Sequence, residues 1–105
     1  MPRAKAAKET RKPRQLPRPF EMHWGSGQII EEASWTGPHH EPTIQLLQYD
    51  DGAAAGSVTV RFCSYNHSGQ FQRSPLMVNE DAIAGLKEAL KKTPQLRRVL
   101  QRLVT

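Results

Sequence analysis

Arginine and aromatic side chains gather in one stretch of the chain, SVTVRFCSYNHSGQFQRSP, from residue 57 to residue 75. Alternate residues of a strand point the same way, so Arg61 and Tyr65 are expected to share one face of a sheet. Arginine binds phosphate, and base–aromatic stacking contributes ~1–3 kcal/mol per base in single-stranded complexes. Together with Phe71 and Arg73, Arg61 and Tyr65 are therefore predicted to form a platform that binds nucleic acid. The alternative is an ordinary solvated sheet face, which has the same composition.

The register of the hairpin decides which face the last two residues occupy. Pairing Tyr65 with Gln70 would place Phe71 and Arg73 opposite Arg61, and a shift by one residue would exchange the faces.

Other chemistry is poorly supported by the residue spacing. Cys63 lies in the middle of a strand, and His39 and His40 are adjacent in a proline-bracketed loop, so neither CxxC nor HxxxH spacing occurs. A GxSxG elbow and a glycine-rich phosphate loop are also missing. We therefore expect no enzymatic activity, no metal or other cofactor, and no small-molecule substrate.

Residues 1–18 form a basic segment with seven basic residues, Glu9 and one large apolar residue, Leu16. Such a composition cannot bury enough surface to offset the entropy of ordering, so the segment is predicted to be a disordered tail. Its cations would add non-specific attraction for nucleic acid, and the candidates are Arg3, Lys5, Lys8, Arg11, Lys12 and Arg14.

Charge is segregated along the rest of the 105-residue chain, whose net charge is +5. Residues 19–60 contain six acidic residues and neither lysine nor arginine, whereas residues 61–105 contain eight basic and three acidic residues. The basic half suits an anionic partner.

Residues 19–105 are expected to form one domain. Alternation of apolar and polar residues, interrupted by glycine, proline and aspartate, predicts four antiparallel strands. These strands cover about 28–35, 43–49, 57–65 and 70–74.

Two helices are predicted to follow the strands. Asn79 is a favourable N-cap for a helix over 79–92, and Thr93-Pro94 starts a second helix over 94–104. The second helix has one apolar face, which could dock a partner protein or a second copy; its residues are Leu96, Val99, Leu100 and Leu103. Strands followed by helices indicate an α+β fold, an antiparallel sheet with C-terminal helices packed on one face.

The run VTVRFCSY, a glycine-containing turn, QFQRSPLMV and then NEDAIAGLKEAL resembles the core of the transcriptional coactivators called positive cofactor four. The resemblance covers about residues 43–92. It implies a sheet that binds single-stranded DNA, a charged N-terminal region, and a helix that helps to form a dimer. The family's sheet is rich in lysine and arginine, which residues 43–60 lack, and Ile83 stands where the family usually has tryptophan.

The leading hypothesis is a non-enzymatic module that binds nucleic acid, preferentially single-stranded DNA or RNA, with a role related to transcription. The alternative is a protein-interaction or assembly module that uses the apolar helix face. A homodimer is expected with either hypothesis. With no apolar run of ~20 residues and no secretory signal, the expected location is the cytoplasm, including association with the nucleoid.

Overall fold

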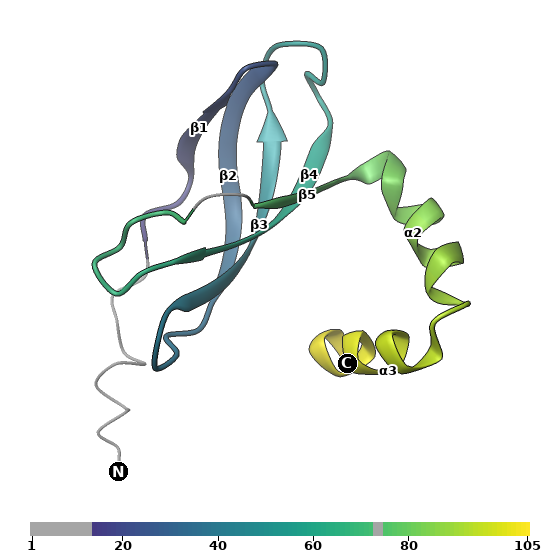
Figure 1. Ribbon diagram of the computed structural model, residues 1–105. Coiled ribbons are helices and arrows are strands. Elements are labelled where there is room, and N and C mark those ends of the chain that lie inside the picture. The colour runs from purple at the N-terminus through teal and green to yellow at the C-terminus, as the bar shows by residue number, and fades with distance from the viewer. Residues whose placement is uncertain (1–13, 73–74) are drawn as a thin grey trace.

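A computed structural model describes residues 14–72 and 75–105 of the protein. It shows an antiparallel β-sheet followed by helices (Figure 1). Its five strands lie in the order β1-β2-β3-β4-β5. They are β1 (Arg18–Met22), β2 (Gly25–Ser34), β3 (Glu41–Tyr49), β4 (Val58–Tyr65) and β5 (Leu76–Asn79). The predicted α+β class is confirmed, with five strands where four were expected.

The additional strand comes from the N-terminal side. β1 pairs antiparallel with β2 across a two-residue turn at His23 and Trp24. The predicted boundary of the tail at residue 18 is therefore wrong, since Arg18 pairs with Ile29 and the side chain of Arg14 already contacts the sheet. Residues 1–13 lie outside the described part of the chain.

The last strand begins later than predicted. β5 starts at Leu76. In the segment where the strand was predicted, Phe71 makes an isolated bridge with Tyr65. Pro75 explains the shift, because proline has no N–H to donate to a ladder and regular pairing starts after it. The turn before it has the expected glycine, Gly69, at φ +83°.

Neighbouring strands approach each other closely at Gly27. It pairs with Phe20 on one side and Tyr49 on the other, and a Cβ atom there would lie 1.9 Å from the backbone oxygen of Gln48. Only glycine permits this separation between β2 and β3.

Strand pairing defines two faces of the sheet. The inner face carries the apolar core, made of Phe20, Ile29, Leu47 and Tyr49, with Met22, Ala54 and Met77 packed against it. The outer face carries the residues that alternate with these, among them Ile44, Leu46, Val60 and Phe62, and the first three are half-buried.

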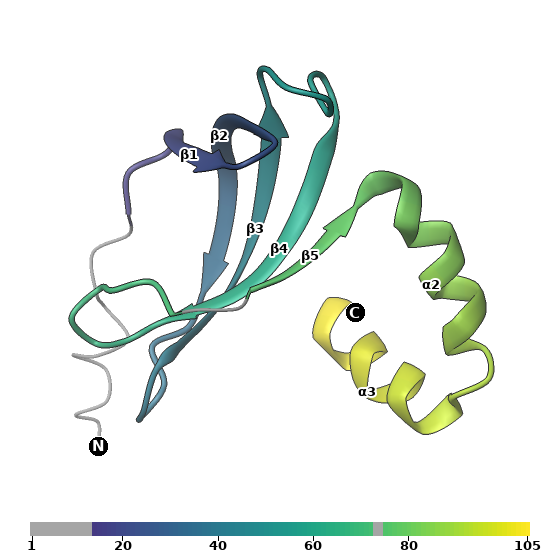
Figure 2. The ribbon, with the colours of Figure 1, turned by 45° about the horizontal axis from the view of Figure 1, so that its top comes forward.

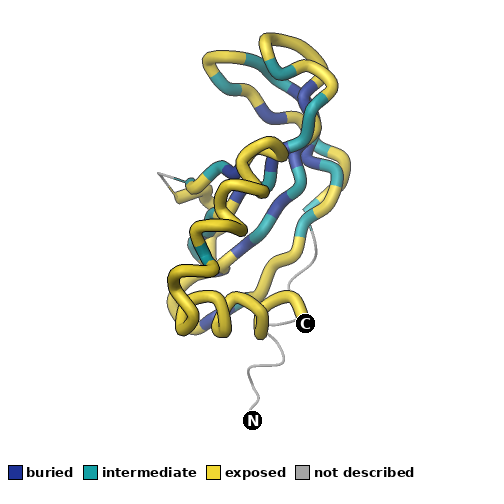
Figure 3. The backbone as a smooth tube through the Cα atoms, turned by 90° about the vertical axis from the view of Figure 1, so that its right-hand side faces the viewer, coloured by how far each residue is buried: buried dark blue, intermediate teal, exposed yellow. Residues whose placement is uncertain are grey.

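The C-terminal helices extend away from the sheet (Figures 1 and 2). A 3-10 turn, η1 (Glu80–Ala82), leads into α2 (Ile83–Leu90), and α3 (Pro94–Val104) follows after a bend. We call residues 80–104 the helical arm. Every residue of the arm except half-buried Leu90 is exposed (Figure 3), so the predicted packing of the helices on the sheet is not found within one chain.

The helix caps differ in part from the prediction. Pro94 is the first residue of α3, as expected from Thr93-Pro94. The Asn79 side chain makes no cap hydrogen bond. Its Oδ1 instead accepts a 2.6 Å hydrogen bond from Thr59 Oγ1, which ties β5 to β4.

Candidate nucleic-acid interface

A buried polar network occupies the inner face beside the apolar core. Its centre is Gln45, which is 1% exposed. Gln45 Oε1 accepts hydrogen bonds from Arg61 Nε at 2.6 Å and from Cys63 Sγ at 3.4 Å. Gln45 Nε2 donates to Glu32 Oε2 at 2.7 Å and to the Tyr65 hydroxyl at 3.0 Å. The amide thus links three strands through side chains alone.

Two arginines from the N-terminal segment close over this network. Arg18 donates to both carboxylate oxygens of Glu32, at 3.2 and 2.8 Å, and to the Tyr65 hydroxyl at 3.1 Å. Arg14 donates to Glu41 Oε1 at 2.8 Å, and its guanidinium carbon lies 3.7 Å from the centre of the Tyr65 ring. Ion pairing and a cation–π contact therefore hold both arginines against the sheet.

The network shifts the pKa values of its members. Burial alone would raise the pKa of Glu32, but hydrogen bonds from Arg18 and Gln45 outweigh burial and hold it below the usual value. The hydrogen bond to Glu32 raises the pKa of Arg18. Burial raises the pKa of the Cys63 thiol, which stays protonated at neutral pH and is a poor nucleophile.

Phe71 extends the network to the surface. Its ring meets the Tyr65 ring edge to face, with centres 5.4 Å apart and planes at 72°. The guanidinium carbon of Arg61 lies 4.7 Å from the centre of the Phe71 ring. Because Phe71 pairs with Tyr65, it lies on the same face of the sheet as Arg61. Phe71 is 41% exposed.

The structure brings together three of the four residues of the predicted platform, but it buries two of them. Arg61 and Tyr65 are each 7% exposed, because Arg14, Arg18 and Phe71 contact them. The expectation that cations and rings share the open face is therefore wrong; the open face is the apolar outer one. Arg73 and the tail residues Arg3, Lys5, Lys8, Arg11 and Lys12 lie outside the described residues.

Several members of the site were missed from the sequence. Gln45, Glu32 and Arg18 were not among the candidates, and Arg14 was placed in a disordered tail. One signal was present: Glu41, Thr43 and Gln45 alternate along β3 in line with Leu47 and Tyr49, so one face of this strand changes from polar to apolar. Alternation alone did not show that the polar half would be covered.

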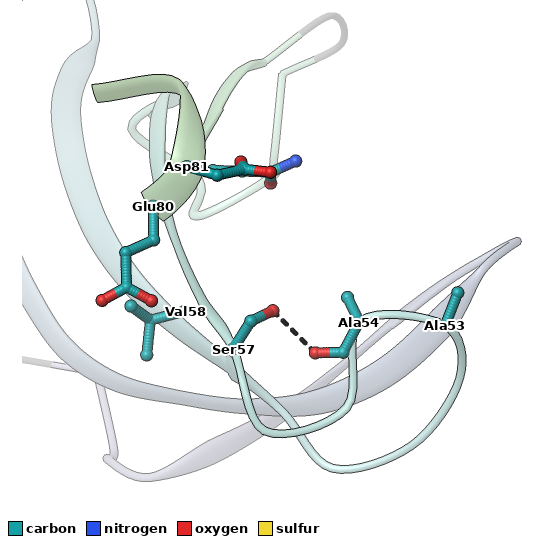
Figure 4. A pocket seen from close by; sticks show the side chains of 7 residues that line it. Ala53, Ala54, Ser57, Val58, Glu80 and Asp81 are labelled. Atoms are coloured by element: carbon teal, nitrogen blue, oxygen red, sulfur yellow. Dashed lines mark hydrogen bonds between the residues drawn. The ribbon is translucent and has the colours of Figure 1, made fainter. Parts of the chain in front are cut away.

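A separate hollow of about 450 Å³ lies between the β3–β4 loop and the start of the helical arm (Figure 4). Ser57 Oγ donates to the Ala54 carbonyl at 2.6 Å on one side, and Glu80 and Asp81 lie on the other.

Among residues 14–72 and 75–105, no group of three or more His, Cys, Asp or Glu side chains is arranged to hold a metal ion. One of the histidines, His67, has its Nε2 atom at hydrogen-bonding distance, 2.8 Å, from the Gly37 carbonyl oxygen.

No helix in the described part of the chain is long and apolar enough to cross a membrane. No family model matches the chain, and no curated protein or solved structure is significantly similar to it.

Proposed function

We propose that the protein is a non-enzymatic module that binds single-stranded nucleic acid along the polar half of its inner face. The observation that carries this proposal is the convergence of Arg14, Arg18 and Arg61 on the rings of Tyr65 and Phe71. Three guanidinium groups face two carboxylates, those of Glu32 and Glu41, which leaves the cluster with excess positive charge.

Within this site the residues have different roles. Exposed Phe71 stacks on a base. Arg61 positions the Phe71 ring from beneath and is not itself open to a phosphate. Arg14 and Arg18 lie at the rim of the network and can exchange a carboxylate for a phosphate, to which a guanidinium also binds through two hydrogen bonds.

The tail supports the same site. It joins the domain at Arg14, so its five further basic residues are tethered next to the cluster by sequence alone. Such a tail adds attraction without base specificity and raises the association rate. We propose a cytoplasmic location, in which the protein has access to nucleic acid.

Fluorescence anisotropy with a labelled single-stranded oligonucleotide tests the proposal. We expect binding at low salt. The logarithm of Kd should rise linearly with the logarithm of the salt concentration, because binding releases counterions from the nucleic acid. Phe71→Ala should weaken binding by about 5-fold to 100-fold, which corresponds to the loss of one stacked base. Trp35→Ala is the matched control, since Trp35 is an exposed ring beyond the end of β2 and is not a member of the hydrogen-bonded network.

Two results would contradict the proposal. One is the absence of binding by the full chain at low salt, and the other is an equal loss of affinity in the Phe71 and Trp35 variants.

A further inference from the structure

Two apolar surfaces of this chain have no partner among residues 14–72 and 75–105. The first is the outer patch of the sheet, which is formed by Ile44, Leu46, Val60, Phe62 and Leu76. Phe62 and Leu76 are exposed, and the other three residues are half-buried. A shallow hollow of about 260 Å³ lies over Ile44, Leu46 and Val60, so the patch is not sealed by its neighbours.

The second surface is a stripe along the helical arm. Its members recur at helical spacing on α2 and α3, and they are Ile83, Leu86, Leu90, Leu96, Val99, Leu100 and Leu103. All of them except half-buried Leu90 are exposed. Exposed apolar residues that recur at helical spacing on two successive helices indicate a contact surface.

The arm does not lie on the outer patch of its own sheet. It leaves the sheet at the end of β5 and bends between α2 and α3, and α3 lies apart from the strands (Figures 1 and 2). The radius of gyration is 15.7 Å, whereas a compact chain of this length would have about 13 Å.

We propose that a second copy of this chain covers both surfaces, with the arm of each copy lying on the outer patch of the other. Each copy supplies what the other needs, because no helix of the described residues covers the outer face of its sheet and no strand covers the stripe of its arm. A two-fold axis makes both contacts identical and closes the assembly. This inference does not rest on the proposed function, since the dimer contact uses the outer face of the sheet and Phe71 lies on the inner face.

Charge complementarity favours a copy of the same chain as the occupant. The arm carries six cations and three acidic residues: Lys87, Lys91, Lys92, Arg97, Arg98 and Arg102 against Glu80, Asp81 and Glu88. The outward-facing residues of the five strands include Glu21 and Glu31 and neither lysine nor arginine, and Glu31 borders the outer patch. In the dimer, the basic arm therefore lies on a sheet face whose charged residues are acidic.

The two surfaces also have the composition of a dimer interface. Each copy would contribute the apolar residues of the stripe and of the outer patch to the centre, and the charged residues of the arm beside the stripe would form the rim.

Light scattering of the full chain across a micromolar concentration series tests the inference. The natural chain should have the mass of a dimer. Leu103→Asp on the arm and Leu76→Asp on the sheet should each weaken dimerisation by at least about 30-fold, the effect expected for a central contact. Gln101→Asp adds the same charge to α3 on its opposite side and should leave the dimer intact.

Folding of these variants can be verified independently. Leu76 and Leu103 are 60% and 58% exposed, so neither substitution opens the core, and the far-ultraviolet β-sheet signal should persist. Mixing the two variants should restore a heterodimer, because the unchanged arm of one copy can lie on the unchanged patch of the other.

Each alternative outcome overturns the inference. A monomeric natural chain would leave the two surfaces for a different protein. A dimer that tolerates Leu76→Asp but not Leu103→Asp would mean that arms pack only on arms. Two dissociated variants that do not recover on mixing would mean that the arm of one copy does not lie on the patch of the other.

Discussion

Gln45 stands where the inner face changes from apolar to polar. Leu47 and Tyr49 follow it on the same side of β3, and Thr43 and Glu41 precede it. A buried amide is tolerated because both of its polar atoms are bonded, and the groups that bond to it are satisfied in return. The network is therefore stable as a set and sensitive to the loss of any one member.

Replacing Gln45 tests this interdependence. Gln45→Leu should lower the free energy of unfolding by about 2–4 kcal/mol, because Arg61 Nε and the Tyr65 hydroxyl lose a buried partner. The exposed neighbour provides the control: Gln48→Leu should change stability by less than about 0.5 kcal/mol. Urea unfolding measures both, and similar effects for the two variants would refute the role of the network.

Glu32 should make stability depend on acid pH. Its pKa in the folded protein is below the ordinary value of 4.5, so the folded state favours the carboxylate. The resulting stability is fully present above about pH 4.5 and is lost as the pH falls through the lower folded value. The melting temperature of the natural chain should therefore decrease in this range, and Glu32→Gln should flatten the decrease. Identical acid profiles would exclude Glu32 as the cause.

At the scale of elements, β2 depends on glycine where it runs between β1 and β3. Gly27→Ala would place a methyl group against the Gln48 carbonyl, and the strands would have to separate. We expect a loss of about 1–3 kcal/mol or a misfolded chain.

The arm supplies the matched substitution. Gly85 has nothing within 4 Å of its Cβ position and lies inside α2, so Gly85→Ala should stabilise the helix by up to about 1 kcal/mol. Thermal unfolding of both variants separates steric crowding from backbone entropy, and a stabilised Gly27→Ala variant would contradict the observed strand spacing.

At the scale of the whole molecule, the arm's secondary structure should depend on assembly. Helices of 8 and 11 residues are shorter than the ~12–15 residues that remain helical alone in water, so α2 and α3 need a surface to pack on. If the second copy supplies it, circular dichroism at 222 nm should weaken on dilution in step with dissociation. Leu103→Asp should show the weakened signal at every concentration. A signal that does not change on dilution through dissociation would show that the arm is stable alone.

The sequence by itself determined β2, β3, β4 and the two helices, and the two sets of side chains along β3 and β4. Period-two alternation placed Arg61, Cys63 and Tyr65 together, and Thr93-Pro94 marked the start of α3, because both follow from local backbone geometry. It did not determine which set is covered. That depends on contacts between distant segments: Arg14 and Arg18 close over the arginine face, and the pairing of Tyr65 with Phe71 adds a ring to it. Polar side chains can be buried when they satisfy one another, and only the tertiary structure brings those partners together.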